Sequence, residues 1–507
     1  MFLLENYNIL NSQRLSGILL HPTSFPSKFG IGDLGSCAYN FIDFLVKSNQ
    51  KIWQVLPLGH TGYGDSPYQS FSSFAGQPLI ISPQKLIDIN LLNEDDVYYD
   101  NSFNSNKIDY GYVIKYKFSI LRKAYSNFVI INDFNLRHNW SKFCDREKKW
   151  LDNYALFMAL KDLNKGSMWI NWDNSMSHPT KETKESMINE LTYEINFYKF
   201  IQFIFYEQWS QLKKYANDKG IYIIGDLPIF TSFDSSDVWA NKQLFSLDSS
   251  GYPIDVAGVP PDYFSKTGQL WGNPLYNWEV HKETNYEWWV DRLSHVLKLV
   301  DIVRIDHFRG FESYWSIPYG NKTAINGTWK KGPSKDLFDT FVNKFGNELP
   351  IIAEDLGIIT EQVRILRDNY NLPGMKILQF AFETTDDNEF LPYNYNKNTI
   401  CYTGTHDNDT TRGWYKYTNE LNKDKVRRYM NTDGKDISWD FIRTCFGSVS
   451  NTAIVPLQDI LCLDNHARMN LPGSSMGNWQ WRYTENMLTD FIIYKLKSTT
   501  KLFGRNI

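Results

Sequence analysis

The stretch DIVRIDHF, residues 301–308, contains the pattern that decides the fold. It begins with apolar, β-branched residues and ends on polar ones, with Arg304, Asp306 and His307 in its second half. A run that is nearly continuous in apolar residues at its start is typical of a strand buried on both faces, as in a parallel sheet. We therefore predict a buried strand here, with its polar end at the edge of the sheet.

Seven further stretches share this pattern. They are SGILLHP (16–22), KIWQVLPLG (51–59), IYIIGDLPIF (221–230), LPIIAEDL (349–356), GMKILQFAF (374–382), TICYTGTHD (399–407) and TAIVPLQDI (452–460). Helical patterns alternate with them at 38–50, 199–220, 286–300, 336–346, 360–370 and 485–498. Eight buried strands alternating with helices predict an α/β fold, a (β/α)8 TIM barrel.

Two connections are too long for a plain barrel. Residues 60–220 separate the second and third strands and contain a helical pattern at 111–128, which predicts one or more inserted, largely helical subdomains. Residues 231–300 form a second insertion, and its stretch 251–278 is rich in Gly, Pro and aromatic residues, as functional loops are. We expect residues 1–507 to form a single barrel domain with these insertions.

Composition narrows the function classes. Lys and Arg number 53 against 57 Asp and Glu, a net charge of −4, so no basic field predicts nucleic-acid binding. No run approaches the roughly 18 apolar residues of a membrane span, and the N-terminus lacks the pattern of a secretory leader. The five cysteines are scattered without a C-x-x-C pair, which indicates a reducing compartment and no structural zinc site. We expect a cytoplasmic protein that binds neither nucleic acid nor membranes; its oligomeric state is left open.

Aromatic residues make up 16% of the chain, with 17 Trp, 31 Tyr and 33 Phe. Many stand beside Gly, Asp, Asn and Pro in apparent loops, such as TGYGDSPYQSF (61–71) and GNWQWRY (477–483). Aromatic rings presented by polar loops stack on sugar faces or on nucleic-acid bases. Without a basic field, sugars are the favoured ligand.

Acidic residues follow four of the predicted strands, where barrel enzymes place their chemistry. They are Asp226, Asp306, Glu354 with Asp355, and Asp407 with Asp409. A single strand-end Asp often caps a turn, but clustered carboxylates repel one another and lower stability unless they have a use. Two uses fit: a Mg²⁺ or Mn²⁺ site, or a carboxylate pair for glycoside cleavage.

The position of Arg304 favours the carboxylate pair for glycoside cleavage over the metal site. Arg304 precedes Asp306 by two residues and therefore points to the same face of its strand. We expect its guanidinium to lower the pKa of Asp306 and keep that carboxylate ionised, which suits a nucleophile and opposes a cation. Glu354 then fits the general acid, and Asp407 fits a third acid that stabilises the transition state. His406 either donates to a sugar hydroxyl or bonds to the backbone.

These stretches belong to longer motifs that together resemble one family. They are WQVLPLGHTGYGDSPYQSFSSFAG (53–76), GDLPIF (225–230), DSSDVWANKQLF (234–245), VAGVPPDYFSKTGQLWGNPLYNW (256–278), VRIDHFRGF (303–311), IIAEDLG (351–357), GMKILQFAF (374–382), YTGTHDNDT (402–410) and PLQDILCLDNHARMNLPGSSMGNWQWR (456–482). Over nearly the whole chain the sequence resembles the 4-α-glucanotransferases, or amylomaltases, of glycoside hydrolase family 77. The resemblance implies a barrel that lacks the C-terminal β-domain of the α-amylases.

The resemblance also implies an activity: retaining transfer of an α-1,4-glucan segment from a donor maltooligosaccharide to the 4-hydroxyl of an acceptor. It assigns Asp306 as the nucleophile that forms a covalent glycosyl intermediate, Glu354 as the acid/base and Asp407 as the stabiliser, without cofactor or metal. Implied sugar contacts are Ser66, Tyr68, Asp226, Tyr263, Phe264, Gln269, Trp271, Arg304, His406 and Asn478.

Departures from the family pattern concern only fine donor or acceptor preference. They are His60, Thr231-Ser232-Phe233, Ser334 and His466. The alternatives to a transferase are an α-amylase-like glucan hydrolase, a non-catalytic glucan-binding protein and a metal-dependent barrel hydrolase. The G-x-G-x-x-G at 30–35 is no dinucleotide site, because it lacks the tight strand–turn–helix context.

Overall fold

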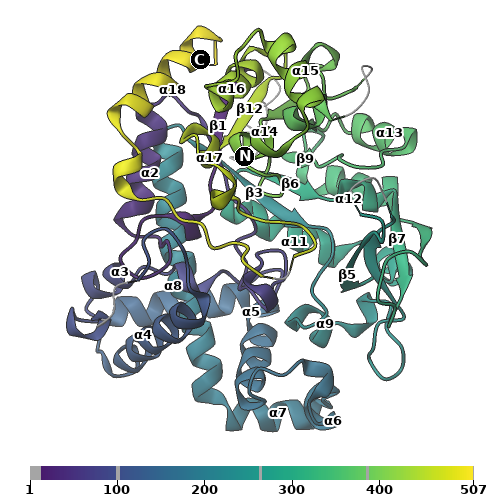
Figure 1. Cartoon of the computed structure of the whole chain (residues 1–507). Helices are drawn as coiled ribbons and strands as arrows, with labels where there is room; N and C mark the ends of the chain where they lie inside the picture. Colours follow the sequence, from purple (N-terminus) through teal and green to yellow (C-terminus); the bar gives the residue numbers. More distant parts are fainter. Residues whose placement is uncertain (1–12, 99–102, 262–264, 384–387, 475, 506–507) are drawn as a thin grey trace.

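The computed structural model of the protein describes residues 13–98, 103–261, 265–383, 388–474 and 476–505. Its centre is an eight-stranded, all-parallel sheet curved into a barrel (Figure 1). The strands are β1 (Leu15–Leu19), β2 (Ile52–Gln54), β3 (Tyr222–Pro228), β6 (Ile302–Asp306), β9 (Ile351–Ala353), β10 (Gly374–Ile377), β11 (Thr399–Tyr402) and β12 (Thr452–Pro456). Each overlaps one of the eight predicted runs, so the predicted barrel is confirmed.

The strand order shows how the barrel nearly closes. Strands pair in the order β10–β11–β12–β1–β2–β3–β6–β9, which leaves β10 and β9 at the two edges of the sheet. The backbone N–H of Ala353 in β9 donates to the carbonyl of Pro373, just before β10, at 3.0 Å. This bond brings the two edges together, so the carboxyl ends of all eight strands surround one opening.

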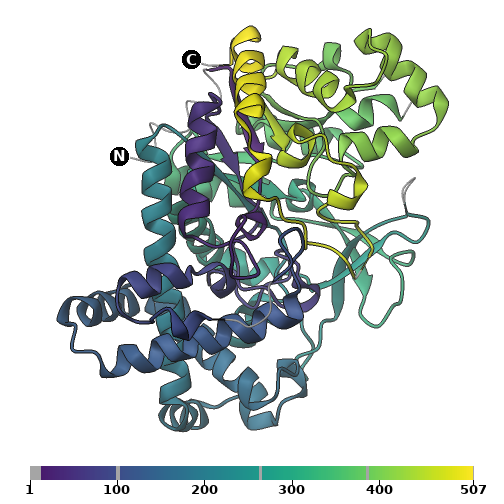
Figure 2. The same cartoon turned by 60° about the vertical axis from the view of Figure 1, so that its left-hand side comes forward.

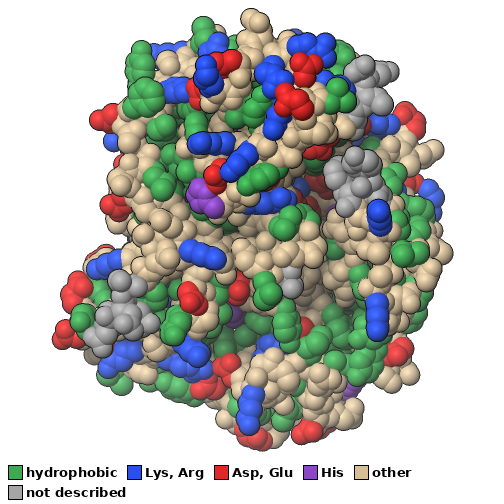
Figure 3. Space-filling view, in the orientation of Figure 1, with side chains coloured by type: hydrophobic (Ala, Val, Ile, Leu, Met, Phe, Trp, Pro, Cys, Tyr) green, Lys and Arg blue, Asp and Glu red, His purple; other side chains and the backbone are tan. Residues whose placement is uncertain are grey.

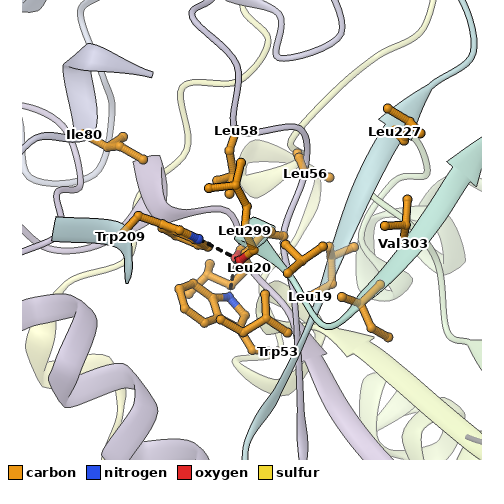
Figure 4. Close-up of a cluster of buried hydrophobic side chains, with 14 of the residues drawn as sticks. Leu19, Leu20, Trp53, Leu56, Leu58, Ile80, Trp209, Leu227, Leu299 and Val303 are labelled. Carbon is orange, nitrogen blue, oxygen red and sulfur yellow. Dashed lines mark hydrogen bonds between the residues drawn. The ribbon is translucent and has the colours of Figure 1, made fainter. Parts of the chain in front are cut away.

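Two buried tryptophans join neighbouring elements, one within the barrel and one within the helical layer around it (Figure 4). The indole N–H of Trp53, on β2, donates to the carbonyl of Leu20 at 2.8 Å. The indole N–H of Trp209, on helix α8 (Thr192–Asp218), donates to the carbonyl of Leu299 at 2.8 Å. Leu20 follows β1 and Leu299 is the last residue of α11, so each indole bonds a carbonyl at the end of a strand or helix. Both large rings are therefore buried without an unpaired polar group.

The predicted helices are present with shifted ends. They are α2 (Ser36–Lys47), α8, α11 (Glu287–Leu299), α12 (Ser334–Phe345), α13 (Glu361–Asn369) and α18 (Asp490–Leu502). Helix α18 begins five residues later than predicted, because Thr489 is its N-cap and its hydroxyl accepts from the N–H of Ile492. Figure 2 shows α18 lying beside α2, so the two ends of the chain cover the same side of the barrel.

The connection from β2 to β3 is helical. It contains α3 (Pro83–Asp88), α4 (Tyr110–Ile130), α5 (Phe134–Leu163), α6 (Asn174–Ser177) and α7 (Lys181–Glu190) before α8 begins. These helices gather on one side of the barrel, at the bottom of Figure 1, and α8 leads from them back to β3. No helix within the described ranges is both long enough and apolar enough to span a membrane.

A second sheet was not predicted. It is antiparallel, in the order β5 (Gln269–Pro274), β4 (Asp255–Val259), β7 (Ser313–Pro318), β8 (Thr328–Lys331). Strands β4 and β5 lie inside the stretch 251–278 that the sequence analysis treated as a loop. Their short, Gly- and Pro-interrupted sequences carry no clear period, and β4 forms much of its pairing with the distant β7.

The barrel end opposite the strand carboxyl termini depends on one buried arginine. Arg505 is fully buried, and its guanidinium donates to the carbonyls of Leu15, Phe446, Ser450 and Asn451 at 2.8–3.0 Å. We expect Arg505→Met to lower the free energy of unfolding by about 3 kcal/mol, because these buried carbonyls lose their donor. Chemical denaturation measures this. The exposed Lys501→Met is the matched control, and equal stability of the two variants would contradict this role for Arg505.

Candidate active site

The predicted acids meet at the carboxyl ends of the barrel strands. Asp226 lies in β3, Arg304 and Asp306 lie in β6, Glu354 follows β9, and Asp407 follows β11. In the β3–β6 ladder, Asp226 is the partner of Arg304, so the two side chains start side by side. Parallel register therefore gathers residues that are far apart in the sequence.

Arg304 joins two of the carboxylates directly. Its Nη1 lies 2.6 Å from Asp226 Oδ2 and 3.0 Å from Asp306 Oδ1. The guanidinium and the Asp226 carboxylate are almost fully buried, whereas the Asp306 side chain keeps 29% of its surface exposed. Asp306 is thus the member of the trio that a substrate can reach.

Burial dominates the pKa values of the two candidate catalytic acids. It raises the pKa of Asp306 well above its ordinary value, and the charges of Asp226, Glu354 and Asp407 add to this, while Arg304 lowers it. The expectation that Arg304 lowers the pKa of Asp306 and keeps this carboxylate ionised was therefore wrong in the net direction of the shift, because burial and three neighbouring acids outweigh one guanidinium. Burial likewise raises the pKa of Glu354 to about 7, against the opposing charge of Arg304.

Two backbone donors hold Glu354 in place. The N–H of His307 donates to Oε2 at 2.7 Å, and the N–H of Leu356 donates to Oε1 at 3.0 Å. His307 can offer its N–H because it adopts the left-handed conformation, with φ of 53°, immediately after β6. The turn after Asp306 therefore fixes the direction of Glu354.

Tyr68 and His406 form the next layer of the site. The Tyr68 hydroxyl donates to Asp226 Oδ2 at 2.7 Å and lies 2.9 Å from His406 Nε2, and the two rings stack with centroids 5.2 Å apart. Burial lowers the pKa of His406, so the imidazole is neutral. Because the hydroxyl proton is committed to Asp226, we assign the His406 proton to Nε2, donating to Tyr68. The imidazole Nε2 thus contacts the Tyr68 side chain, and a sugar contact for His406 stays a prediction.

The remaining predicted sugar contacts differ in their surroundings. Trp271, on β5, places its ring at 87° against the His307 ring with centroids 4.8 Å apart, and donates to Gln269 Oε1 at 3.2 Å. The Ser66 hydroxyl accepts from the N–H of Tyr68 at 3.3 Å. Asn478 bonds within its own loop, to the N–H of Leu471 and the carbonyl of Ser474. Tyr263 and Phe264 lie outside the described residues.

Three residues at the site had no predicted role. The Trp479 ring lies 5.9 Å from the Tyr68 ring and 6.0 Å from the His406 ring, centroid to centroid. Asn470 Nδ2 donates to Asp407 Oδ1, and Arg468 Nη2 donates to the Asp407 carbonyl, both at 2.6 Å. All three lie in the motif 456–482, but nothing in their spacing marks them, because they reach the site only through a loop that folds back.

The departures from the family pattern lie elsewhere. His60 is buried, its Nδ1 lies 2.7 Å from the Tyr154 hydroxyl, and burial lowers its pKa to about 3. Thr231 bonds the Tyr276 hydroxyl at 3.1 Å, Ser334 begins α12, and the exposed His466 pairs with Asp464. None of these recorded bonds involves Asp306, Glu354 or Asp407.

The charge arrangement bears on the metal alternative. Arg304 occupies the position between Asp226 and Asp306 where a cation would have to bind. Within the described parts of the chain, no three His, Cys, Asp or Glu side chains are placed to share a metal ion. On the face drawn in Figure 3, positive and negative side chains are interspersed around a central hollow.

Comparison with known proteins identifies the family. The family model described as 4-alpha-glucanotransferase matches residues 20–489. The 4-alpha-glucanotransferase of Synechocystis sp. is 47% identical over 498 residues, covering 98% of this chain and 99% of that protein. That of Clostridium butyricum is 48% identical over 491 residues, covering 96% of this chain and all of that protein.

A solved structure agrees with these sequence matches. The amylomaltase from Streptococcus agalactiae in complex with acarbose superposes with a TM-score of 0.94 at 41% identity, covering 97% of this chain and 100% of that one. Family model, relatives and structure each extend over nearly the whole chain, barrel and insertions included. The chain belongs to the 4-alpha-glucanotransferase family.

Proposed function

We propose that this 4-alpha-glucanotransferase moves an α-1,4-glucan segment from a donor maltooligosaccharide to the 4-hydroxyl of an acceptor glucan or glucose, through a covalent intermediate on Asp306. The observation that carries the proposal is that Asp306 contacts Arg304 while Glu354, just after the neighbouring strand β9, has a pKa raised to about 7. A retaining enzyme needs this combination of a reachable carboxylate and a carboxyl group that still holds its proton near neutral pH.

In the first step, one acid acts as the nucleophile and the other acts as the proton donor. Asp306 and Glu354 both have raised pKa values and titrate as a coupled pair, so the cluster keeps a proton that neither group owns alone. The contact with Arg304 favours placing the negative charge on Asp306 and the proton on Glu354. Asp306 then attacks the anomeric carbon while Glu354 protonates the departing O4, which breaks the C1–O4 bond and leaves a glycosyl ester.

The second step reverses these roles. Glu354, now ionised, removes the proton from the 4-hydroxyl of the acceptor, whose oxygen attacks the anomeric carbon and releases Asp306. Two inversions at the same carbon give net retention. Asp407, whose side chain is 46% exposed, faces the reaction as a further carboxylate and stabilises the positive charge that develops on the sugar ring.

Transfer requires that an acceptor sugar outcompetes water. Trp271 supports this, because its indole lies against His307, the residue whose N–H holds the acid/base Glu354. A flat ring beside the acid/base is suited to stacking on an acceptor glucose and displacing water there.

We further propose Ser66, Tyr68, Asp226, Gln269, Arg304, His406 and Asn478 as sugar contacts, with Tyr263 and Phe264 from the sequence alone. We also propose a cytoplasmic location, since all five cysteines are free thiols.

Incubation with maltotriose tests the function. We expect a ladder of longer maltooligosaccharides together with glucose, because the glycosyl intermediate is captured by a second sugar. Chromatography of the products over time measures this. As a control, exhaustive chelation should leave the rate of transfer unchanged if no metal takes part. Glucose and maltose alone would identify a hydrolase.

Asp306→Ala is the matching variant for the nucleophile. We expect it to lose essentially all turnover, by a factor of at least about 10³, while it still binds maltotriose in calorimetry. Retained binding separates a lost nucleophile from a collapsed site. Activity close to that of the parent would remove the role assigned to Asp306.

The raised pKa of Glu354 predicts the alkaline limb of the pH profile. Because Glu354 acts in its protonated form and loses its proton with a pKa of about 7, kcat/KM should fall as pH rises above about 7. An aryl α-maltotrioside, whose phenol leaves without protonation, provides the control. With this donor, the rate of the phenol burst in Glu354→Gln should not fall as the pH rises above about 7. An unchanged alkaline fall in this variant would assign the titration to a group other than Glu354.

A further inference from the structure

The loop that follows β12 reaches across the barrel opening and binds the residues after β11. Arg468 donates from Nη2 to the carbonyl of Asp407 at 2.6 Å and from Nε to the carbonyl of Asn470 at 2.7 Å. Asn470 donates from its backbone N–H to the carbonyl of His406 at 3.1 Å and from Nδ2 to Asp407 Oδ1 at 2.6 Å. Three of these bonds connect residues 468–470 with the two neighbours His406 and Asp407, and the fourth joins Arg468 to Asn470 within the loop.

We propose that Asn470 and Arg468 are positioning residues that hold Asp407 in the orientation needed to stabilise the transition state. The inference rests on the role proposed for Asp407 above and adds the residues that make this role possible. Arg468 fixes the backbone of Asp407, and the Asn470 amide fixes its carboxylate. Together they determine both the position and the rotation of the side chain.

The exposure of Asp407 explains why it needs such support. Asp226 and Arg304 are held by burial, with side-chain exposures of 0% and 4%, but the Asp407 side chain is 46% exposed. An exposed aspartate on a loop samples several rotamers, and a carboxylate displaced by an ångström loses much of its effect on a developing charge. A hydrogen bond from the neutral amide to the carboxylate restricts the carboxylate but leaves its negative charge in place. A lysine at this position would neutralise that charge.

The second carboxylate oxygen of Asp407 lies on the side of His406. Asp407 Oδ2 lies 3.4 Å from His406 Nε2, the atom that also contacts the Tyr68 hydroxyl. With Oδ1 bonded to Asn470, Oδ2 is the oxygen directed toward His406 and Tyr68. Asn470 thus holds Oδ1 and leaves Oδ2 on the side of His406.

The loop itself is closed by further internal bonds. The N–H of Trp479 donates to the carbonyl of Met469 at 2.7 Å, and the Asn478 side chain accepts from the N–H of Leu471 at 3.0 Å. Residues on both sides of Asn470 are therefore tied together, and the ring of Trp479 lies near His406. The loop presents Asn470 to Asp407 from a constrained backbone.

Asn470→Ala tests the proposal through the split between kcat and KM. We expect kcat for maltotriose disproportionation to fall about 10- to 100-fold while KM changes less than about threefold, because the lost bond acts on the transition state. Asn470→Ser, which restores a donor hydroxyl, should recover part of kcat. His466→Ala, in the same loop and exposed, is the control and should match the parent.

A double-mutant cycle with Asp407→Ala separates positioning from general damage. In the Asp407→Ala background, Asn470→Ala should cause no further loss of kcat, because there is no carboxylate left to position. Additive losses of kcat in the double variant would overturn the role of Asn470. So would a fall in kcat that is accompanied by a fall in thermal stability and is not reduced by Asn470→Ser. If Asp407→Ala itself is fully active, the proposed role of Asp407 fails instead, so the two failures are distinguishable.

Discussion

The contact of one guanidinium with two carboxylates organises this protein. Arg304 bonds Asp226 and Asp306 at the carboxyl end of β3 and β6, with Glu354 and Asp407 close enough to influence the same charges. One cation cannot compensate all these acids, and burial adds to the cost of ionising them. The outcome is a cluster that retains a proton near neutral pH, and proton retention is what separates a general acid from a structural carboxylate.

The barrel makes this arrangement possible because its parallel strands end at one opening. Asp226 is the ladder partner of Arg304, and buried indoles hold neighbouring elements together: Trp53 joins β2 to the residue after β1, and Trp209 joins α8 to the end of α11. A rigid support of this kind is needed, since carboxylates that repel one another would separate if their strands were free to move. The packed strands and helices thus supply the stability that offsets the repulsion among the carboxylates at the strand ends.

The side chains that surround the acid cluster come from connections that leave the barrel and return. The insertion between β2 and β3 begins with the segment that supplies Tyr68, the antiparallel sheet supplies Trp271 beside His307, and the last long loop supplies Asn470 and Trp479. Each reaches a different side of the same cluster. The barrel strands thus supply the carboxylates, and the connections supply the side chains around them.

The sequence by itself determined the barrel and the acids. Runs such as 221–230 and 301–308 are apolar and end in charge, a pattern set by burial on both faces, so the eight strands and the positions of Asp226, Asp306 and Glu354 were predictable. The pairing of Arg304 with Asp306 followed from the two-residue period of a strand. Only the tertiary structure decided the second sheet, the net direction of the Asp306 pKa and the contact between Asn470 and Asp407. These depend on contacts between segments far apart in the chain and on the summed effect of burial and several charges, and neither quantity is contained in any local stretch of residues.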